Sequence, residues 1–387
     1  MGHRLAFTQF SVAARRNGPL VLYLALCTLL VGLTATAQER KATFITFDVP
    51  GAGTGVLQGT SAYGTIPSGL TEGNYFGADN VFHVFLRARD GTFTTFDAPG
   101  ASQGTSPNSM NLAGAITGHY YESDFVAHGF LRAPDGTFTT FDAPAAGTNG
   151  GQGTIPTNIN PARTISGWYV DANYVGHGFV RASDSTIISF DAPGSIGTFP
   201  GVFDGMNPAG DIVGGYFDAA AVSHGFLRAA DGRLTSFDAP GAGTASGQGT
   251  SASGINPSGE ISGVLVDAEC VVHGFVRARG GSITTFDVPG AGTGSGQGIA
   301  VSPAPPSINA QGAITGSYID ANNVRHGFVR ARDGSIMAFD VPGAGTGSLC
   351  LGFYSQGTYS FSENAAGTVT GWYVDAGCMV HGFLRIP

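Results

Sequence analysis

The segment 154–194 reads TIPTNINPARTISGWYVDANYVGHGFVRASDSTIISFDAPG, and it contains four short runs in which apolar residues alternate with polar or small ones. The runs cover Thr157–Asn160, Thr164–Asp171, Gly176–Ala182 and Thr186–Asp191, with turn-forming Pro, Asp, Asn and Ser between them. Alternation with a period of two, bounded by turn residues, is typical of antiparallel strands joined by hairpins. The segment therefore predicts one four-stranded sheet.

The same pattern recurs along the chain. Each of the first six His-x-Phe motifs is followed 14 residues later by the Asp of a Phe-Asp pair, and successive copies lie 45 to 55 residues apart. Four strands in that length predict the blade of a β-propeller, whereas the rung of a β-helix is much shorter. A solenoid is thus the less favoured alternative. The Phe-Asp pairs end at Asp48, Asp97, Asp142, Asp191, Asp238, Asp287 and Asp340, and the motifs begin at His83, His128, His177, His224, His273, His326 and His381.

The two ends of the repeat array complement each other. The array opens with a lone fourth strand, 43–48, and it stops at Pro387 directly after a third strand. Pairing between these two strands would cover two open sheet edges. We therefore expect residues 38–387 to form a single all-β domain, a seven-bladed β-propeller of four-stranded antiparallel blades, closed by the N-terminal strand.

Residues 1–37 have the pattern of a secretory signal peptide. Arg4, Arg15 and Arg16 precede the apolar run 20–33, and the small residues of 35–37 follow it. The run is shorter than a membrane span, which is the alternative, and the paired arginines leave a twin-arginine route open. The sequence predicts a secreted or periplasmic protein with no membrane span after cleavage.

The composition limits the possible partners. Gly accounts for 62 of 387 residues and charged residues for 12%, which argues against both a helical and a disordered chain. Loss of the three leader arginines would change the net charge from −9 to −12. Such a chain has no basic face for phosphates, so we expect no nucleic-acid partner, and we expect a monomer.

The repeated motifs also resemble a known family. His-Gly-Phe followed by Phe-Asp-x-Pro-Gly is similar to the extracellular HAF-type repeat of bacterial secreted proteins, although that family usually has Ala in the middle position and the first repeat here has His83-Val84-Phe85. The resemblance covers nearly all of 43–387. It implies an exported, propeller-like repeat protein, and it carries no established activity.

The repeated polar residues favour a structural role. A His, an Arg and an Asp occur at equivalent positions in every repeat, and seven equal copies are not expected of a catalytic centre. Buried polar groups need hydrogen-bond partners, and these residues would supply them between strands. We also expect the Phe of both motifs to form the core between blades.

Ligand binding is predicted on the face that carries the loops after the second and fourth strands, here called the variable face. All length variation falls between each Asp and the Asn of the next first strand, and the two longest segments precede the last two repeats. Variable loops on a rigid scaffold are common binding sites. The candidate residues are Pro303, Pro305, Pro306, Asp320, Asn322, Phe353, Tyr354, Tyr359, Trp372 and Asp375.

No cofactor and no metal site is predicted. Turn aspartates such as Asp320 and Asp375 leave Ca²⁺ open as an alternative, but no D-x-D-x-D-G run accompanies them. Cys350 and Cys378 share the seventh repeat and the variable face, so they are the favoured disulfide in an oxidising compartment, which leaves Cys270 free.

These features favour a binding or interaction module for a glycan or a protein of the cell envelope, with its site near repeats six, seven and one. One alternative is a propeller lyase or hydrolase that acts on polysaccharide, for which His119, Glu122 and Asp124 are the candidate acid and base groups. A structural envelope protein without a small ligand is the second alternative.

Overall fold

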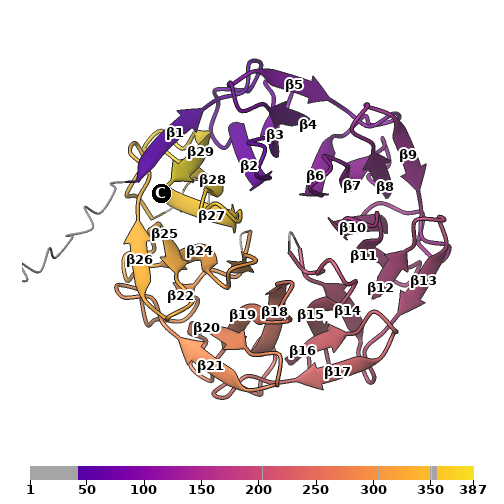
Figure 1. Ribbon diagram of the computed structural model, residues 1–387, viewed down its shortest axis with the longest axis vertical. Helices are drawn as coiled ribbons and strands as arrows, with labels where there is room; N and C mark the ends of the chain where they lie inside the picture. The colour runs from indigo at the N-terminus through magenta and orange to yellow at the C-terminus, as the bar shows by residue number, and fades with distance from the viewer. Residues whose placement is uncertain (1–41, 203, 304, 349, 351–354) are drawn as a thin grey trace, which may run out of the picture. The chain divides into compact units, whose positions relative to one another are not determined.

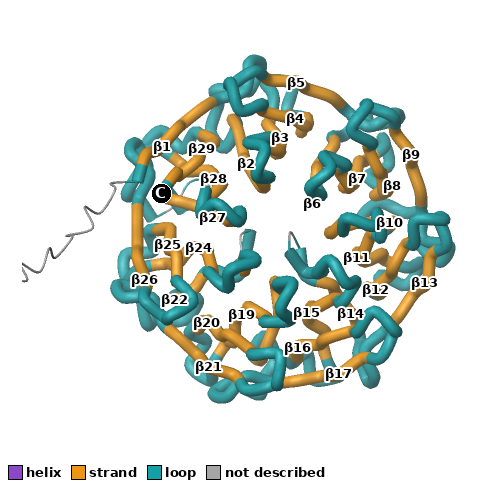
Figure 2. The backbone as a smooth tube through the Cα atoms, in the orientation of Figure 1, coloured by secondary structure: helices purple, strands orange, loops and turns teal. Residues whose placement is uncertain are grey.

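A computed structural model describes residues 42–202, 204–303, 305–348, 350 and 355–387. The predicted signal peptide, 1–37, lies outside these residues. Every regular element of the described unit is a β-strand, which confirms the prediction of an all-β fold. Figures 1 and 2 show short sheets that follow one another around a common centre, with one strand of each sheet innermost and one outermost. This arrangement is propeller-like.

Each repeat contributes strands of four kinds, paired antiparallel in chain order. The first, innermost strands are β2 (Gly59–Thr65), β6 (Thr105–Met110), β10 (Gly153–Ile159), β14 (Gly197–Pro200), β18 (Gly249–Ile255), β22 (Gly298–Ile299) with β23 (Ser307–Ile308), and β27 (Gly357–Glu363). The second strands are β3 (Thr71–Phe76), β7 (Ile116–Tyr121), β11 (Ile165–Val170), β15 (Ile212–Phe217), β19 (Ile261–Val266), β24 (Ile314–Ile319) and β28 (Val369–Val374).

The third strands are β4 (Phe82–Arg87), β8 (Ala127–Arg132), β12 (Gly176–Arg181), β16 (Ser223–Arg228), β20 (Val272–Arg277), β25 (Arg325–Arg330) and β29 (Val380–Ile386). The fourth, outermost strands are β1 (Thr43–Phe47), β5 (Phe93–Phe96), β9 (Phe138–Phe141), β13 (Ile187–Phe190), β17 (Leu234–Phe237), β21 (Ile283–Phe286) and β26 (Ile336–Phe339). In the segment 154–194 the strands fall where the alternation predicts them, except that β10 starts earlier than expected.

The first strand of the described chain completes the last sheet. β1 pairs antiparallel with β29, with Thr43 opposite Ile386 and Phe47 opposite Gly382. The side chains follow the same pattern, because His381 Nδ1 lies 3.0 Å from a carboxylate oxygen of Asp48. The seventh repeat therefore takes its fourth strand from the other end of the chain, and β1 lies beside β29 in Figure 1.

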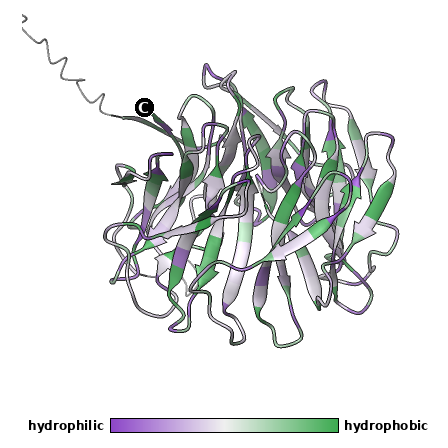
Figure 3. Cartoon of the chain, turned by 60° about the horizontal axis from the view of Figure 1, so that its bottom comes forward, coloured by the Kyte–Doolittle hydropathy of each residue, from purple (hydrophilic) through white to green (hydrophobic). Residues whose placement is uncertain are grey.

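Aromatic side chains form the core between neighbouring repeats. The Phe of each His-x-Phe motif is fully buried, and in most repeats its ring contacts the Phe of the preceding Phe-Asp pair, as Phe275 does with Phe237 at 6.0 Å between ring centres. The third-strand Arg covers that same ring, and Arg277 lies 4.9 Å above Phe237. Figure 3 shows many of the apolar positions on the strands. Both motifs therefore serve packing between sheets, as predicted.

A glycine at the start of the innermost strands allows neighbouring repeats to approach closely. Gly59 adopts φ +129°, and a Cβ atom there would lie 1.9 Å from the carbonyl oxygen of Val380 in the seventh repeat. Gly249 likewise leaves room for the carbonyl of Ser223. Only glycine tolerates both the positive φ and the backbone contact, which accounts for part of the unusual glycine content.

The innermost strand is interrupted in repeats four and six. β14 ends at Pro200, and the two short strands β22 and β23 flank residues 300–306. Asp204 lies beyond β14, where its carbonyl accepts a hydrogen bond from Ile255 N at 2.9 Å and its carboxylate accepts one from Ser307 Oγ. These interruptions bring loop residues toward the centre of the described unit.

Candidate functional site

The seven repeated histidines form hydrogen bonds within the sheets. Each Nδ1 lies 2.6 to 3.0 Å from a carboxylate oxygen of the Phe-Asp aspartate. Six of the rings also lie 4.9 to 5.3 Å from a second-strand Tyr ring. The hydrogen bond with Asp48 raises the pKa of His381, and Asp340 does the same for His326. The repeated His and Asp therefore tie third strands to fourth strands.

A cavity of about 450 Å³ opens among the variable-face ends of repeats seven, one and two. Aromatic rings make up much of its wall, and Phe82 among them is 45% exposed. Pro303 of the sixth repeat also borders it. We call it the variable-face cavity. Its lining includes the aromatic residues Tyr63, Phe76, Phe82, Tyr121, Phe361 and Trp372, and the polar residues Ser61, Asn74, Gln103, Thr105, Ser106 and His119.

Hydrogen bonds hold several polar groups of the cavity wall in place. Tyr63 Oη donates a hydrogen bond to Asn74 Oδ1 at 3.0 Å, and Asn74 Nδ2 lies 3.4 Å from Ser106 Oγ. Asn108 Nδ2 lies 3.0 Å from His119 Nδ1, which makes this nitrogen the acceptor and leaves Nε2 as the protonated nitrogen. Burial lowers the pKa of His119 to about 4, so the ring is neutral near pH 7.

The cavity wall carries no Asp, Glu, Lys or Arg among the residues that the structure describes. Glu122 and Asp124 do not line it, and both are exposed. Asp124 Oδ1 accepts a hydrogen bond from Val126 N at 3.1 Å, as an aspartate at a turn does. The trio considered for acid–base chemistry is therefore not assembled around this cavity, where His119 is neutral and has amide and aromatic neighbours.

Some predicted binding residues lie at the cavity and others beneath its wall. Pro303 and Trp372 line it, although Trp372 is only 4% exposed. Tyr359 is fully buried, with its ring stacked 3.7 Å from that of Trp372. The guanidinium carbon of Arg325 lies 4.3 Å from the centre of the Tyr359 ring. Phe353 and Tyr354 lie outside the described residues.

The remaining predicted residues support turns and strands. Asp320 Oδ1 accepts hydrogen bonds at 2.8 Å from the backbone N–H groups of Asn322 and Val324. Asp375 Oδ1 likewise accepts a hydrogen bond from the backbone N–H group of Met379 at 2.9 Å. Pro306 is buried, and its carbonyl accepts a hydrogen bond from Ser262 Oγ at 3.1 Å. Pro305 precedes it and is half-buried, so neither proline lines the variable-face cavity.

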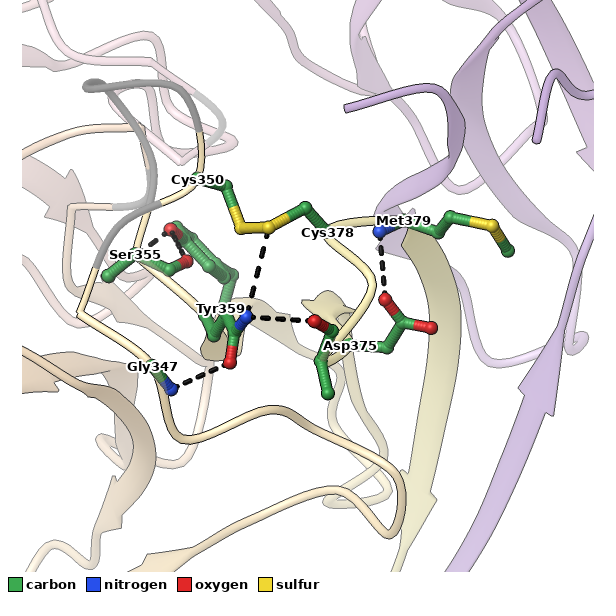
Figure 4. Close-up of a disulfide and its surroundings, with 9 residues drawn as sticks. Gly347, Cys350, Ser355, Tyr359, Asp375, Cys378 and Met379 are labelled. Atoms are coloured by element: carbon green, nitrogen blue, oxygen red, sulfur yellow. Dashed lines mark hydrogen bonds between the residues drawn. A yellow bond between two sulfur atoms is a disulfide. The ribbon is translucent and has the colours of Figure 1, made fainter. Parts of the chain in front are cut away.

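A disulfide joins Cys350 to Cys378, the pair favoured by the sequence, with Cα atoms 5.7 Å apart. Cys270 is a free thiol. Figure 4 shows that the bridge lies beside Tyr359, whose Oη donates a hydrogen bond to the carbonyl of Ser355 at 2.8 Å. The bridge thus ties the segment before β27 to the turn between β28 and β29, behind the Trp372 side of the cavity.

Sequence reasoning missed several cavity residues. Asn74 was not among the candidates, although it shares one variable second-strand position with His119 and Trp372, which were predicted for acid–base chemistry and for binding. Tyr121 gave a weaker signal, because Phe, Val or Ile occurs at its position in the other repeats, whereas Phe82 stands where they have Ala, Gly, Ser, Val or Arg. Their exposure at one shared cavity depends on the arrangement of repeats one, two and seven in space.

The described residues contain neither a candidate metal-binding cluster nor a candidate membrane-spanning helix. No cluster of three His, Cys, Asp or Glu side chains there could hold a metal ion. The same residues contain no apolar helix of membrane-spanning length.

No protein-family model and no curated protein sequence matches the chain. Solved structures do match it. A streptogramin B lyase aligns with a TM-score of 0.53 at 14% identity, over 88% of this chain and 97% of the lyase chain. The fold is propeller-like. A puromycin hydrolase aligns with a TM-score of 0.53 at 12% identity, over 84% of this chain and 51% of the other.

A six-bladed β-propeller lectin from Aleuria aurantia, described with a fucose recognition mode, aligns with a TM-score of 0.42 at 12% identity, over 80% of this chain and all of the lectin chain. The roles of these proteins differ, and their identities to this chain are low. The comparisons therefore establish the fold alone.

Proposed function

We propose that this chain is an exported, seven-bladed β-propeller that binds a neutral glycan in the variable-face cavity. The observation that carries the proposal is the lining of that cavity, in which aromatic rings and neutral hydrogen-bonding groups surround about 450 Å³. A sugar ring presents apolar faces that pack on aromatic rings and hydroxyl groups that pair with amide, hydroxyl and imidazole groups. A charged ligand would find no counter-charge on the described part of the wall.

The blade number rests on the strand pairing. Seven third strands are each paired with a fourth strand, and the seventh of these pairs is β29 with β1. The His381–Asp48 hydrogen bond repeats at this pair the contact made in the other six repeats. These pairings support a ring of seven blades closed by the N-terminal strand. The leader-like segment 1–37 and the resemblance to HAF-type repeats support export.

The cavity is held by rigid parts of the scaffold. Asn74, His119 and Trp372 stand on second strands that pair on both sides, so their backbone positions are constrained. Rigid polar groups lose little conformational freedom on binding, which favours affinity. The disulfide adds a covalent tie behind Trp372. Given the aromatic and neutral polar lining of this cavity, the partner we propose is a glycan of the cell envelope rather than an envelope protein.

Binding is favoured over catalysis by the state of His119. A glycan lyase or hydrolase needs an acid and a base that face one bond of the substrate. His119 has a depressed pKa, and its Nδ1 accepts a hydrogen bond from an amide. No carboxylate accompanies it among the described lining residues. Turnover of a bound glycan by the intact protein would favour the enzymatic alternative instead.

The test is a glycan array with the protein that lacks the predicted signal peptide, residues 38–387 (the mature protein). Titration calorimetry then measures the affinity of any glycan that binds. The variants Phe82→Ala and Tyr121→Val replace cavity residues with those found at the same positions in repeats two and three, Ala127 and Val170. We expect each to weaken binding by about tenfold, because a lost aromatic contact and its buried area are worth ~1 kcal/mol or more.

Phe217→Val is the matched control, because Phe217 occupies the position equivalent to Tyr121 in repeat four and does not line the cavity. It should bind the glycan as the wild type does. Absence of any glycan ligand would contradict the proposal and favour the structural alternative. Binding that survives both cavity variants would contradict the location of the site.

A further inference from the structure

A second cavity of about 330 Å³ lies at the opposite end of the innermost strands, where the turns have constant length. Residues of all seven repeats line it, and Tyr63 borders both this cavity and the variable-face cavity. Leu112 also lines it, and its side chain is 69% exposed to solvent. We call it the axial cavity. One lining residue from each repeat is Ile66, Asn111, Asn160, Pro208, Asn256, Asn309 and Asn364.

Three carboxyl groups line the axial cavity, and no Lys, Arg or His does so among the described residues. Glu72 of β3 is only 2% exposed, and its Oε2 has no hydrogen-bond partner. Glu363, at the end of β27, likewise has an unpartnered Oε2. Asp204 accepts a hydrogen bond from Ser307. An unpartnered carboxyl oxygen buried in the wall of a cavity is costly unless a ligand supplies its partner.

These carboxyl groups are departures from the repeat. The residues at the position of Glu72 in the other repeats are Thr117, Ser166, Val213, Ser262, Thr315 and Thr370. The residues at the position of Glu363 are Thr65, Met110, Ile159, Met206, Ile255 and Ile308. The sheets of the other repeats therefore form without a carboxyl group at either position. Folding alone does not explain the presence of Glu72 and Glu363.

We propose that the axial cavity binds a small organic polyamine, whose ammonium groups pair with Glu72, Glu363 and Asp204. The carboxyl groups are not gathered as metal ligands, since the described residues include no group of three acids, His or Cys that could hold an ion. Charges spread around one cavity match a ligand with separated charges. Apolar lining residues such as Met110, Ile159 and Ile255 suit the methylene chain between them.

Binding of a cation should release protons. Burial raises the pKa of Glu72 to about 8 and that of Glu363 to about 7, although Arg385 opposes the second shift. Burial also raises the pKa of Asp204. Tyr63 is the other titratable group on the wall. Ammonium groups favour the ionised carboxylates, so affinity should rise as the pH increases from 6 to 8, where alkylamines stay protonated.

The test is titration calorimetry of the mature protein with spermidine at pH 6, 7 and 8, in two buffers that differ in ionisation enthalpy. We expect saturable binding with proton release at pH 7, and none with 1,4-butanediol as the uncharged probe. Glu72→Thr and Glu363→Ile, which restore residues common at these positions, should each weaken binding by about tenfold, the effect of losing one charged hydrogen bond.

The controls separate this site from folding and from the variable-face cavity. Glu269→Gln removes an exposed carboxylate outside both cavities and should leave spermidine affinity unchanged, as should Phe82→Ala. Unfolding curves of each variant check that it is folded. Absence of spermidine binding, or equal affinity in folded Glu72→Thr and Glu363→Ile variants, would overturn the proposal and leave the glycan proposal untouched.

Discussion

At the scale of residues, the repeated side chains build the scaffold and the exceptions to the repeat mark the cavities. His381 and its six counterparts each hold an aspartate of the neighbouring fourth strand. His119 and Trp372 occupy a position where no residue type is shared by all repeats, and both line the variable-face cavity. Glu72 stands where other repeats have Thr, Ser or Val, and it lines the axial cavity.

Glu72 should make stability depend on pH. Its pKa is raised from 4.5 to about 8 in the folded protein, so the folded state favours the protonated form. The associated stability is fully present below pH 4.5 and is lost as the pH rises through about 8. The melting temperature of Glu72→Thr should therefore rise relative to that of the wild type between pH 5 and 9, with a difference in unfolding free energy on the order of 5 kcal/mol at the upper end.

Thermal unfolding of both proteins at pH 5, 7 and 9 measures this effect, with Glu269→Gln as the exposed control. A difference in melting temperature that stays constant over this range would contradict the assigned burial of the Glu72 carboxyl group.

At the scale of elements, the second, third and fourth strands follow the repeat, whereas the innermost strands and the segments before them depart from it. The innermost strand of repeat six is split into β22 and β23, and that of repeat four is short. Pro303, between β22 and β23, lines the variable-face cavity. Asp204, which follows the short strand β14, lines the axial cavity. In repeat seven, the disulfide between Cys350 and Cys378 ties the corresponding segment to a turn of the same repeat.

Loss of that disulfide should lower stability and expose a thiol. Cys350 and Cys378 are separated by 28 residues, and closing a loop of that size stabilises a fold by about 3–4 kcal/mol in the chain-entropy model. Cys378→Ser should therefore lower the melting temperature and add a second reactive thiol, whereas Cys270→Ser should do neither. Mass spectrometry after thiol labelling of exported protein measures the change, and three free thiols in the wild type would rule out the bridge.

At the scale of the whole molecule, the described unit depends on contact between its two chain ends. β1 and β29 exchange backbone hydrogen bonds over five residue pairs. Phe47 of β1 packs on Phe85 of the first repeat, with ring centres 6.1 Å apart, and Arg87 lies 4.9 Å above the same Phe47 ring. The short strand β1 therefore completes the sheet of repeat seven and also packs that sheet against repeat one.

Deletion of 38–48 should remove that contact. The expected result is a large fall in melting temperature or aggregation, because β29 would become an open edge and the core beside Phe85 would be uncovered. His381→Asn is the milder companion, since it keeps β1 and loses only the bond to Asp48. Scanning fluorimetry and size-exclusion chromatography compare the two. A deletion variant with the stability and elution volume of the wild type would contradict the proposed closure of the ring by β1.

The amino-acid sequence by itself determined the strands, their order and the pairing of the chain ends. Each of these follows from the alternation within one repeat, such as 154–194, and from the spacing at which that repeat recurs along the chain. The sequence also favoured the Cys350–Cys378 pair, because both residues fall in one repeat and on one face.

Only the tertiary structure decided which side chains share a cavity. Tyr359 looked available for binding, yet it is fully buried against Trp372, because the innermost strands pack side chain against side chain near the centre. Glu72 and Glu363 are far apart in the chain, and they line one cavity because repeats one and seven are neighbours. Periodicity describes each repeat alone, whereas a cavity at the centre depends on side chains from all of them at once.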